Sequence, residues 1–165
     1  MLSYVVAIGK NNELGNNGTL PWYLPEDLAY FKKVTTSNLN ENVIIMGRKT
    51  FNALPFILPN RHHIVITRDK SFSVNDKNLS VVHDIDYIKK LQLEDKEYFV
   101  IGGAEIFKQL LPNTSKFYMT FVHKTFNADV HFPTIDWGNL TCIYKSDTMY
   151  DRNEDASFTY ETYIR

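Results

Sequence analysis

An aspartate stands among large apolar side chains in the stretch PWYLPEDLAYF, which covers residues 21–31. Pro25 suits the first position of a helix, and a helical wheel places Asp27 in an apolar stripe and Glu26 outside it. The stripe consists of Leu24, Leu28, Phe31, Val34 and Thr35. Asp27 is either a first-turn acid that complements the helix dipole or a partly buried carboxylate whose raised pKa lets it handle a proton.

Cations follow a strand-like run in MGRKT, residues 46–50. Gly47 ends the run, and a short helix then opens with Arg48, Lys49 and Thr50. Cations at a helix start oppose the dipole, and a phosphate bound there would resolve the conflict. A solvated basic turn is an equally good interpretation of the same residues.

A second strand-like run ends in ITRD, residues 66–69, where Thr67 is followed by Arg68. If Arg48 and Arg68 converge, they form a site for a dianionic phosphate such as the 2′-phosphate of NADP. NAD lacks this group and would call instead for an acid near the ribose.

Glycines mark two further places where backbone can approach or cover a ligand. IGG, residues 101–103, joins a strand to a helix, although a glycine pair alone is more often a tight turn. The sequence contains neither a Walker loop nor the Rossmann glycine pattern. NNELGNNGTLPW, residues 11–22, is long and rich in Asn and Gly, which is typical of a functional lid. A merely tolerated surface loop is the alternative for that segment.

Alternating elements must position these groups. Strand-like apolar runs are predicted at 3–9, 42–47, 62–68, 79–84 and 97–103, and helices at 25–36, 48–54, 84–92 and 104–111. After Pro112 the strand-like segments 116–123, 139–147 and 157–165 follow without a long helix between them. The pattern predicts an α/β fold: a mostly parallel central sheet with an antiparallel C-terminal part and helices on both faces.

Composition narrows the classes of protein that this chain can belong to. At 165 residues it predicts a single domain, 1–165, which can bury about 70% of its unfolded surface without a disulfide or metal. A net charge of −1 argues against a nucleic-acid partner, and no apolar stretch approaches the ~20 residues of a membrane span. The N-terminus has no secretory leader, so we expect a cytoplasmic protein.

Cysteine and histidine usage offers no metal site. The single cysteine, Cys142, lies in a strand-like run and is expected to be a buried, inert thiol in a reducing compartment. The five histidines show no metal-ligand spacing, and His62 and His63 should face opposite sides of a strand. We read all five as structural or surface residues, and we predict no metal.

From its first strand to its last, the sequence resembles the bacterial dihydrofolate reductases. The resemblance rests on LGNNGTLPWYLPEDLAYFK, VIIMGRKTF, LPNRHHIVIT, FVIGGAEIF, FYMT and ADVHFP, which occur in the family's order and at its spacing. It implies a sheet of about eight strands. It also implies NADPH-dependent reduction of 7,8-dihydrofolate to 5,6,7,8-tetrahydrofolate, with hydride transfer to pterin C6 and protonation at N5. Antifolate inhibitors would be further small-molecule ligands.

The resemblance assigns Asp27 to the pterin, whose amino group and N3 it would hold. Protonation of N5 would proceed through an ordered water near Trp22, and Leu20 belongs to the lid over the reacting rings. Arg61 would pair with the α-carboxylate of the substrate's glutamate; without the resemblance it reads as a surface charge at a strand edge. The remaining pocket residues would be Val5, Leu28, Phe31, Leu54 and Leu58, with Thr120 bracing the aspartate.

The resemblance also assigns a set of cofactor residues. Val6 and Ala7 would contact the nicotinamide carboxamide, and Leu14 and Gly15 would join Leu20 in the lid. The 2′-phosphate would bind Arg48, Thr67 and Arg68. The pyrophosphate would bind Lys49, Thr50 and the turn Gly102–Gly103–Ala104, whose Gly–Gly bond is cis in this family. The set is completed by Gly47, Glu105, Ile106 and Phe107, with His83 near the adenine.

Several of these positions depart from common family variants, and one is Leu20, which replaces a frequent methionine in the lid. Glu105 stands where many relatives carry a basic or neutral residue, so it either weakens phosphate binding or points to solvent. Phe107 replaces a frequent tyrosine, so a hydroxyl is absent beside the nicotinamide.

Two alternatives remain open at this point. One is a reductase of another pterin or a pyrimidine-like substrate, which would not need Arg61. The other is a nucleotide- or folate-binding protein without catalysis, against which Asp27 and the intact lid argue. Because no exposed apolar stripe stands out, we expect a monomer.

Overall fold

The structure is a computed structural model that describes residues 1–39 and 41–165. Its helices are α1 (Pro25–Thr35), α2 (Arg48–Ala53), α3 (Ile85–Lys90) and α4 (Ala104–Leu110), with 3-10 turns at Leu91–Leu93, Leu111–Asn113 and Trp137–Asn139. Its strands are β1 (Leu2–Ile8), β2 (Glu13–Gly15), β3 (Val43–Gly47), β4 (His62–Ile66), β5 (Leu79–Val82), β6 (Tyr98–Gly102), β7 (Thr114–Val122), β8 (Val130–His131), β9 (Thr141–Lys145), β10 (Met149–Asp151) and β11 (Ala156–Ile164).

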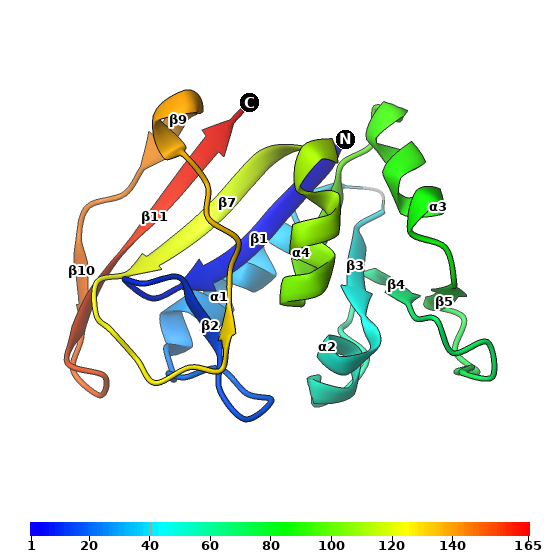
Figure 1. The fold of residues 1–165 in the computed structure, drawn as a ribbon, viewed down its shortest axis with the longest axis horizontal. Helices are drawn as coiled ribbons and strands as arrows, with labels where there is room; N and C mark the ends of the chain where they lie inside the picture. The colour runs from blue at the N-terminus through cyan, green and yellow to red at the C-terminus, as the bar shows by residue number, and fades with distance from the viewer. Residues whose placement is uncertain (40) are drawn as a thin grey trace.

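One continuous sheet forms the centre of the molecule, in the order β10-β11-β7-β1-β6-β3-β4-β5 (Figure 1). The strands from β7 to β5 are all parallel, whereas β11 is antiparallel to β7. Strands β9 and β10 both pair with β11, along different parts of it, so among the described residues the sheet is eight positions wide. The predicted fold class is therefore confirmed.

The central strands are buried on both faces, as their continuous apolar runs predict. In β1, alternate residues pack in different clusters: Tyr4 lies with α3 and α4, and Val5 lies with α1 and α2. Connections that run along the sheet in opposite directions place their helices on opposite faces, because parallel crossovers are right-handed. Helix α4 accordingly crosses in front of the sheet in Figure 1, and α1 lies behind it.

Short strands were missed by the sequence patterns. Within the lid segment 11–22, β2 pairs with β8 in a separate two-stranded sheet, and β10 extends the edge of the main sheet. Strands of two or three residues carry no periodic signal, so only their pairing with distant segments reveals them. The other predicted elements are present, with bounds that differ by a few residues.

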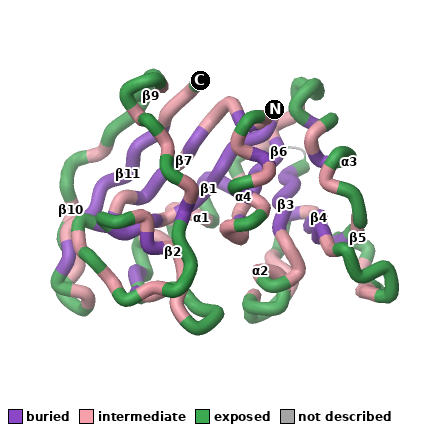
Figure 2. The backbone as a smooth tube through the Cα atoms, viewed as in Figure 1, coloured by how far each residue is buried: buried purple, intermediate pink, exposed green. Residues whose placement is uncertain are grey.

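The expectation of a buried Cys142 is wrong. All five residues of β9 are exposed, as Figure 2 shows along this edge of the sheet, and Cys142 is an exposed free thiol. Since β9 pairs with β11 at the sheet edge, its β-branched and aromatic residues give it a strand pattern without burial.

Within residues 1–39 and 41–165, the structure contains no helix long and apolar enough to span a membrane.

Candidate active site

Asp27 is fixed by a contact between a helix and the sheet. Pro25 begins α1, and two residues later Asp27 Oδ1 accepts a 2.6 Å hydrogen bond from the Thr120 hydroxyl on β7. Register places Thr120 beside Ala7 of β1 on one side and Tyr160 of β11 on the other. The carboxylate is thus held over the part of the sheet where β1, β7 and β11 meet.

Burial raises the pKa of Asp27 above its ordinary value, and the hydrogen bond from Thr120 opposes that rise. Part of the residue remains accessible to solvent, so the carboxyl group can still meet a ligand. An exposed first-turn acid would keep an ordinary pKa, and the geometry therefore favours the second interpretation of Asp27, a group able to hold a proton.

The apolar stripe of α1 packs as the wheel predicts, with one exception. Leu24, Val34 and Thr35 are buried, and Phe31 is half-buried. Leu28 is 51% exposed and lies one residue beyond Asp27, so it offers an apolar surface next to the carboxylate.

Four of the predicted pocket residues share one apolar cluster between the sheet and the helices α1 and α2. Val5 is buried in this cluster, and partly buried side chains packed against it include Phe31, Leu54 and Leu58. These residues come from β1, from α1 and from the loop after α2, which the fold brings together on one side of the sheet.

Trp22 is buried beside Phe126, with ring centroids 5.0 Å apart. Its indole N–H is also buried, and within the part of the chain that the structure describes it has no acceptor. A buried donor of this kind is normally satisfied by a protein group, a water or a ligand. The unpaired indole N–H of Trp22 therefore suits a hydrogen bond to an ordered water that lies between the protein and a substrate.

The lid segment is tied to the chain that follows β7. Asn17 N donates to Asp129 Oδ2 at 3.0 Å, and Asp129 N donates to Gly15 O at 3.0 Å. Of the other lid residues, Leu14 packs against the core and Leu20 is 49% exposed. These bonds attach one part of the lid, while Leu20, which follows the Asn16–Thr19 turn, remains accessible.

Glu13 is a residue that sequence reasoning missed. It is 1% exposed, and its carboxylate accepts hydrogen bonds from the backbone N–H groups of Asn11 and Phe126 at 2.5 and 2.8 Å. It joins the start of the lid to the segment after β7. Nothing local distinguishes this acid from a surface residue, because its partner at Phe126 is distant in sequence.

Arg61 is 6% exposed, so the residue-based interpretation as a surface charge is wrong. Its Nε donates to Pro59 O at 3.0 Å, and its Nη1 donates to Thr35 Oγ1 at 3.1 Å. Among the described residues no carboxylate pairs with it. A buried guanidinium without a carboxylate retains free donors that suit an anionic ligand.

A cavity of about 480 Å³ lies at the carboxyl ends of strands β4 and β5. Its lining includes Thr67, Arg68, Glu105 and Ile106, all predicted cofactor residues, together with His83. His83 Nδ1 lies 2.9 Å from Thr67 O, which connects the ends of the two strands.

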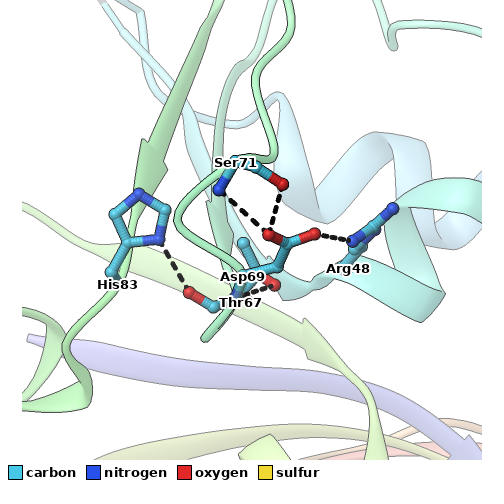
Figure 3. A network of polar contacts seen from close by, with 5 residues as sticks. All are labelled: Arg48, Thr67, Asp69, Ser71 and His83. Atoms are coloured by element: carbon cyan, nitrogen blue, oxygen red, sulfur yellow. Dashed lines mark hydrogen bonds and ion pairs between the residues drawn. The ribbon is translucent and has the colours of Figure 1, made fainter.

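The Arg48 side chain, at the start of α2, contacts residues that follow β4. Its Nη1 donates to Asp69 Oδ2 at 2.8 Å (Figure 3). Its guanidinium carbon lies 4.5 Å from the Phe72 ring centroid. Asp69 also accepts from Ser71 N and Oγ, at 2.9 and 2.6 Å, and those bonds together with Arg48 lower its pKa. Arg48 is thus fixed against the turn that contains Arg68.

The turn after β6 is tightly packed against α2. The Gly102–Gly103 bond is cis, as the resemblance implies, and Gly102 has φ +140°. A Cβ on Gly102 or Gly103 would lie 3.3 or 3.4 Å from Thr50 Oγ1, so glycine lets the hydroxyl and backbone approach one another. At Gly47, a Cβ would lie 3.3 Å from Ile106. This cradle of backbone and hydroxyl suits the oxygens of a pyrophosphate.

The remaining predicted cofactor residues lie in several environments. Val6 is buried, Ala7 and Ala104 are half-buried, and Lys49 is exposed. Glu105 accepts a hydrogen bond from Gln109 at 3.1 Å. Phe107 is fully buried, with its ring 4.7 Å from Tyr4 and 5.2 Å from Phe132, so it acts in the core behind the turn.

Among the described residues, no group of three or more His, Cys, Asp or Glu side chains is arranged to hold a metal ion.

Known proteins resemble this chain along its whole length. The sequence profile described as dihydrofolate reductase matches residues 1–165. The dihydrofolate reductase of Bacillus subtilis (strain 168) is 37% identical over 163 residues, covering 98% of this chain and 91% of the relative. That of Staphylococcus aureus is 34% identical over 164 residues, covering 99% and 98%. A solved structure, described as dihydrofolate reductase from Enterococcus faecalis complexed with NADP(H) and RAB-propyl, has a TM-score of 0.85 at 32% identity, covering 100% of this chain and 96% of that one.

The profile matches the whole chain and these relatives are at least 32% identical over nearly all of it, and the chain therefore belongs to the dihydrofolate reductase family.

Proposed function

We propose that this chain reduces 7,8-dihydrofolate to 5,6,7,8-tetrahydrofolate with NADPH, by hydride transfer to pterin C6 and protonation at N5. The observation that carries the proposal is Asp27, a carboxyl group with a raised pKa that Thr120 holds beside apolar side chains. A desolvated acid in this setting favours a protonated, hydrogen-bonded partner, as the pterin ring offers.

On the substrate side, Asp27 holds the pterin through its amino group and N3. Trp22 binds an ordered water through its buried indole N–H, and this water passes a proton toward N5. The walls of the pocket are apolar and limit the access of bulk water. They consist of Val5, Leu28, Phe31, Leu54 and Leu58.

Arg61 binds the α-carboxylate of the substrate's glutamate. Two of its nitrogens are committed to Pro59 O and Thr35 Oγ1, and these bonds orient the guanidinium. The other N–H donors can pair with a carboxylate, and burial makes such a pair stronger than it would be at the surface.

On the cofactor side, the chain's own residues suit NADPH, which when bound supplies the hydride. Lys49, Thr50 and the Gly102–Gly103–Ala104 turn would hold the pyrophosphate, and Gly47 and Ile106 pack closely together next to this turn. Val6, Ala7 and the lid residues Leu14, Gly15 and Leu20 enclose the nicotinamide. Phe107 supports this turn from the core.

Arg48, Thr67 and Arg68 hold the 2′-phosphate. Arg48 uses Nη1 for Asp69, which leaves further donors on its guanidinium for a phosphate. Arg68 and Glu105 line the same cavity, so Glu105 lowers the positive potential that Arg68 provides there.

The proposed enzyme is a monomer, since residues for both ligands come from one chain, and residues 1–165 form one domain around a continuous sheet. The exposed free thiol of Cys142 supports a reducing compartment such as the cytoplasm. Antifolate inhibitors are proposed to compete at the Asp27 pocket. We propose neither a nucleic-acid nor a membrane partner.

The test is to mix the purified protein with NADPH and dihydrofolate and follow the loss of NADPH absorbance. We expect continuous turnover that depends on both ligands, and binding of both without any loss of absorbance would reject the proposal. Replacing dihydrofolate by a dihydropterin that lacks the glutamate tail should raise KM. An unchanged KM would instead favour a reductase of another pterin.

A further inference from the structure

The imidazole of His63 is fully buried and bonded at both ring nitrogens. Leu58 N donates to His63 Nε2 at 3.1 Å, and His63 Nδ1 lies 3.2 Å from Arg61 O. The ring therefore joins two backbone groups of one loop, from Leu58 to Arg61, to strand β4. Its neighbour His62 differs: it is partly exposed, and its Nε2 lies 2.8 Å from Ser80 Oγ.

The two bonds fix the protonation state of the ring. Because an amide can only donate, Nε2 must accept from Leu58, and Nδ1 must therefore carry the proton that it donates to Arg61 O. Burial is the largest effect and, with the nearby charge of Arg61, it lowers the pKa of His63, while hydrogen bonds with the backbone of Arg61 and Asn78 oppose part of that shift. The facing residues of strands β3 and β5, Ile44 and Leu79, are apolar, so they offer no charge that would hold an imidazolium.

The loop that the ring clamps carries two residues of the proposed substrate site. Asn60 within it has φ 63°, a conformation that non-glycine residues adopt at some cost. The Arg61 side chain extends from this loop, and its guanidinium donates hydrogen bonds to Pro59 O and Thr35 Oγ1. The imidazole holds the backbone at both ends of the loop, and it so fixes the backbone position from which the Arg61 side chain extends.

We propose that His63 is a positioning residue for the tail of the substrate. Through its neutral ring it holds the backbone of Leu58 and Arg61, so that Arg61 is placed to bind the glutamate carboxylate. The inference rests on the proposed function of Arg61, and it adds a residue that touches neither ligand.

Two substitutions of His63 test its two hydrogen bonds separately. In His63→Asn the side-chain amide can replace Nδ1 but cannot reach Leu58, and in His63→Gln a terminal oxygen can replace Nε2. His62→Gln is the matched control, because it changes the neighbouring imidazole on the opposite face of the same strand. The readouts are kcat and KM with dihydrofolate and with a dihydropterin that lacks the glutamate tail.

For His63→Asn we expect KM for dihydrofolate to rise about fivefold, as the loss of one buried hydrogen bond implies. We expect kcat and the KM for the tail-less dihydropterin to stay within about twofold of wild type, and His63→Gln to show a smaller rise. Equal increases in KM for both substrates, or a fall in kcat alone, would overturn the proposal, because either would indicate a general structural role.

A second measurement uses the unmodified protein and does not depend on how the variants fold. Nitrogen NMR of wild-type His63 should show a protonated Nδ1 and an unprotonated acceptor at Nε2. The reverse tautomer, or a ring that is charged at neutral pH, would overturn the proposal.

Arg61→Ala separates failure of this inference from failure of the proposed function. If Arg61→Ala raises KM only for dihydrofolate while His63→Asn and His63→Gln leave it unchanged, the inference about His63 is wrong and the role of Arg61 stands. If Arg61→Ala leaves KM for dihydrofolate unchanged, the proposed tail site itself is wrong.

Discussion

The Thr120 hydroxyl donates a 2.6 Å hydrogen bond to Asp27 Oδ1 and so joins strand β7 to helix α1. The two residues are 93 positions apart in the chain. Burial raises the pKa of the aspartate and the hydroxyl lowers it, so the pair sets how readily this carboxyl group ionises. The balance between these two effects leads to the first prediction.

Replacing Thr120 by valine should raise the pKa of Asp27 further, because only the opposing hydrogen bond is removed. We expect the pH profile of kcat/KM to move to higher pH and kcat/KM at neutral pH to fall about tenfold, as the loss of a bond to a charged group implies. Steady-state kinetics from acid to neutral pH measures both. Thr120→Ser retains the hydroxyl and serves as the control; an unmoved profile in the valine variant would remove Thr120 from this role.

Asp27→Asn should make the protein more stable at neutral pH. The pKa of Asp27 is raised in the folded state, so the aspartate favours folding at low pH and this contribution is lost as the pH rises through the folded pKa. Asparagine cannot ionise, and we expect it to add about 1 kcal/mol to the free energy of unfolding at pH 7. The gain should disappear below the ordinary aspartate pKa of 3.8.

Urea unfolding of both proteins across this pH range tests the stability prediction. Glu26→Gln, at the exposed neighbouring position, is the matched control and should change stability little at any pH. A variant at Asp27 that is less stable than wild type at neutral pH would show that the carboxylate supports the fold and is not held there at a cost.

Replacing Arg48 and Arg68 together by glutamine should weaken NADPH binding much more than NADH binding. Arg68 belongs to the turn that carries Asp69, Arg48 is bonded to that aspartate, and only NADPH has a 2′-phosphate for the two arginines to bind. We expect the Kd for NADPH to rise at least about tenfold, with a change of less than about twofold for NADH. Fluorescence titration with both cofactors, using Lys108→Gln as a surface control, measures the difference; equal losses would remove the phosphate-site assignment.

Local patterns predicted the parts of the fold that depend on continuous runs of residues. The β-branched runs became the parallel strands, and the stripe around Asp27, except for Leu28, became the side of α1 that packs on the sheet, because both depend on near neighbours in sequence. Strands β2 and β8, of three and two residues, could not be predicted this way. They form only because two distant segments meet.

The candidate site shows the same limit at the level of single residues. Glu13, Arg61 and His63 are polar residues whose burial depends on backbone partners that the sequence does not reveal. The prediction for Cys142 was wrong in the opposite sense: it expected burial, but a strand pattern at the edge of a sheet does not imply burial. The resemblance to a family supplied Arg61, and it supplied neither Glu13 nor His63.

The most direct test of the central claim follows hydride transfer in a single turnover, with wild type and Asp27→Asn mixed with NADPH and dihydrofolate across acid to neutral pH. At neutral pH the variant should be slower by at least about a hundredfold, since general acid–base assistance contributes this much or more. Its rate should partly recover in acid, where the substrate arrives already protonated. A variant that matches the wild-type rate at every pH would contradict the role of Asp27 and with it the mechanism proposed for this enzyme.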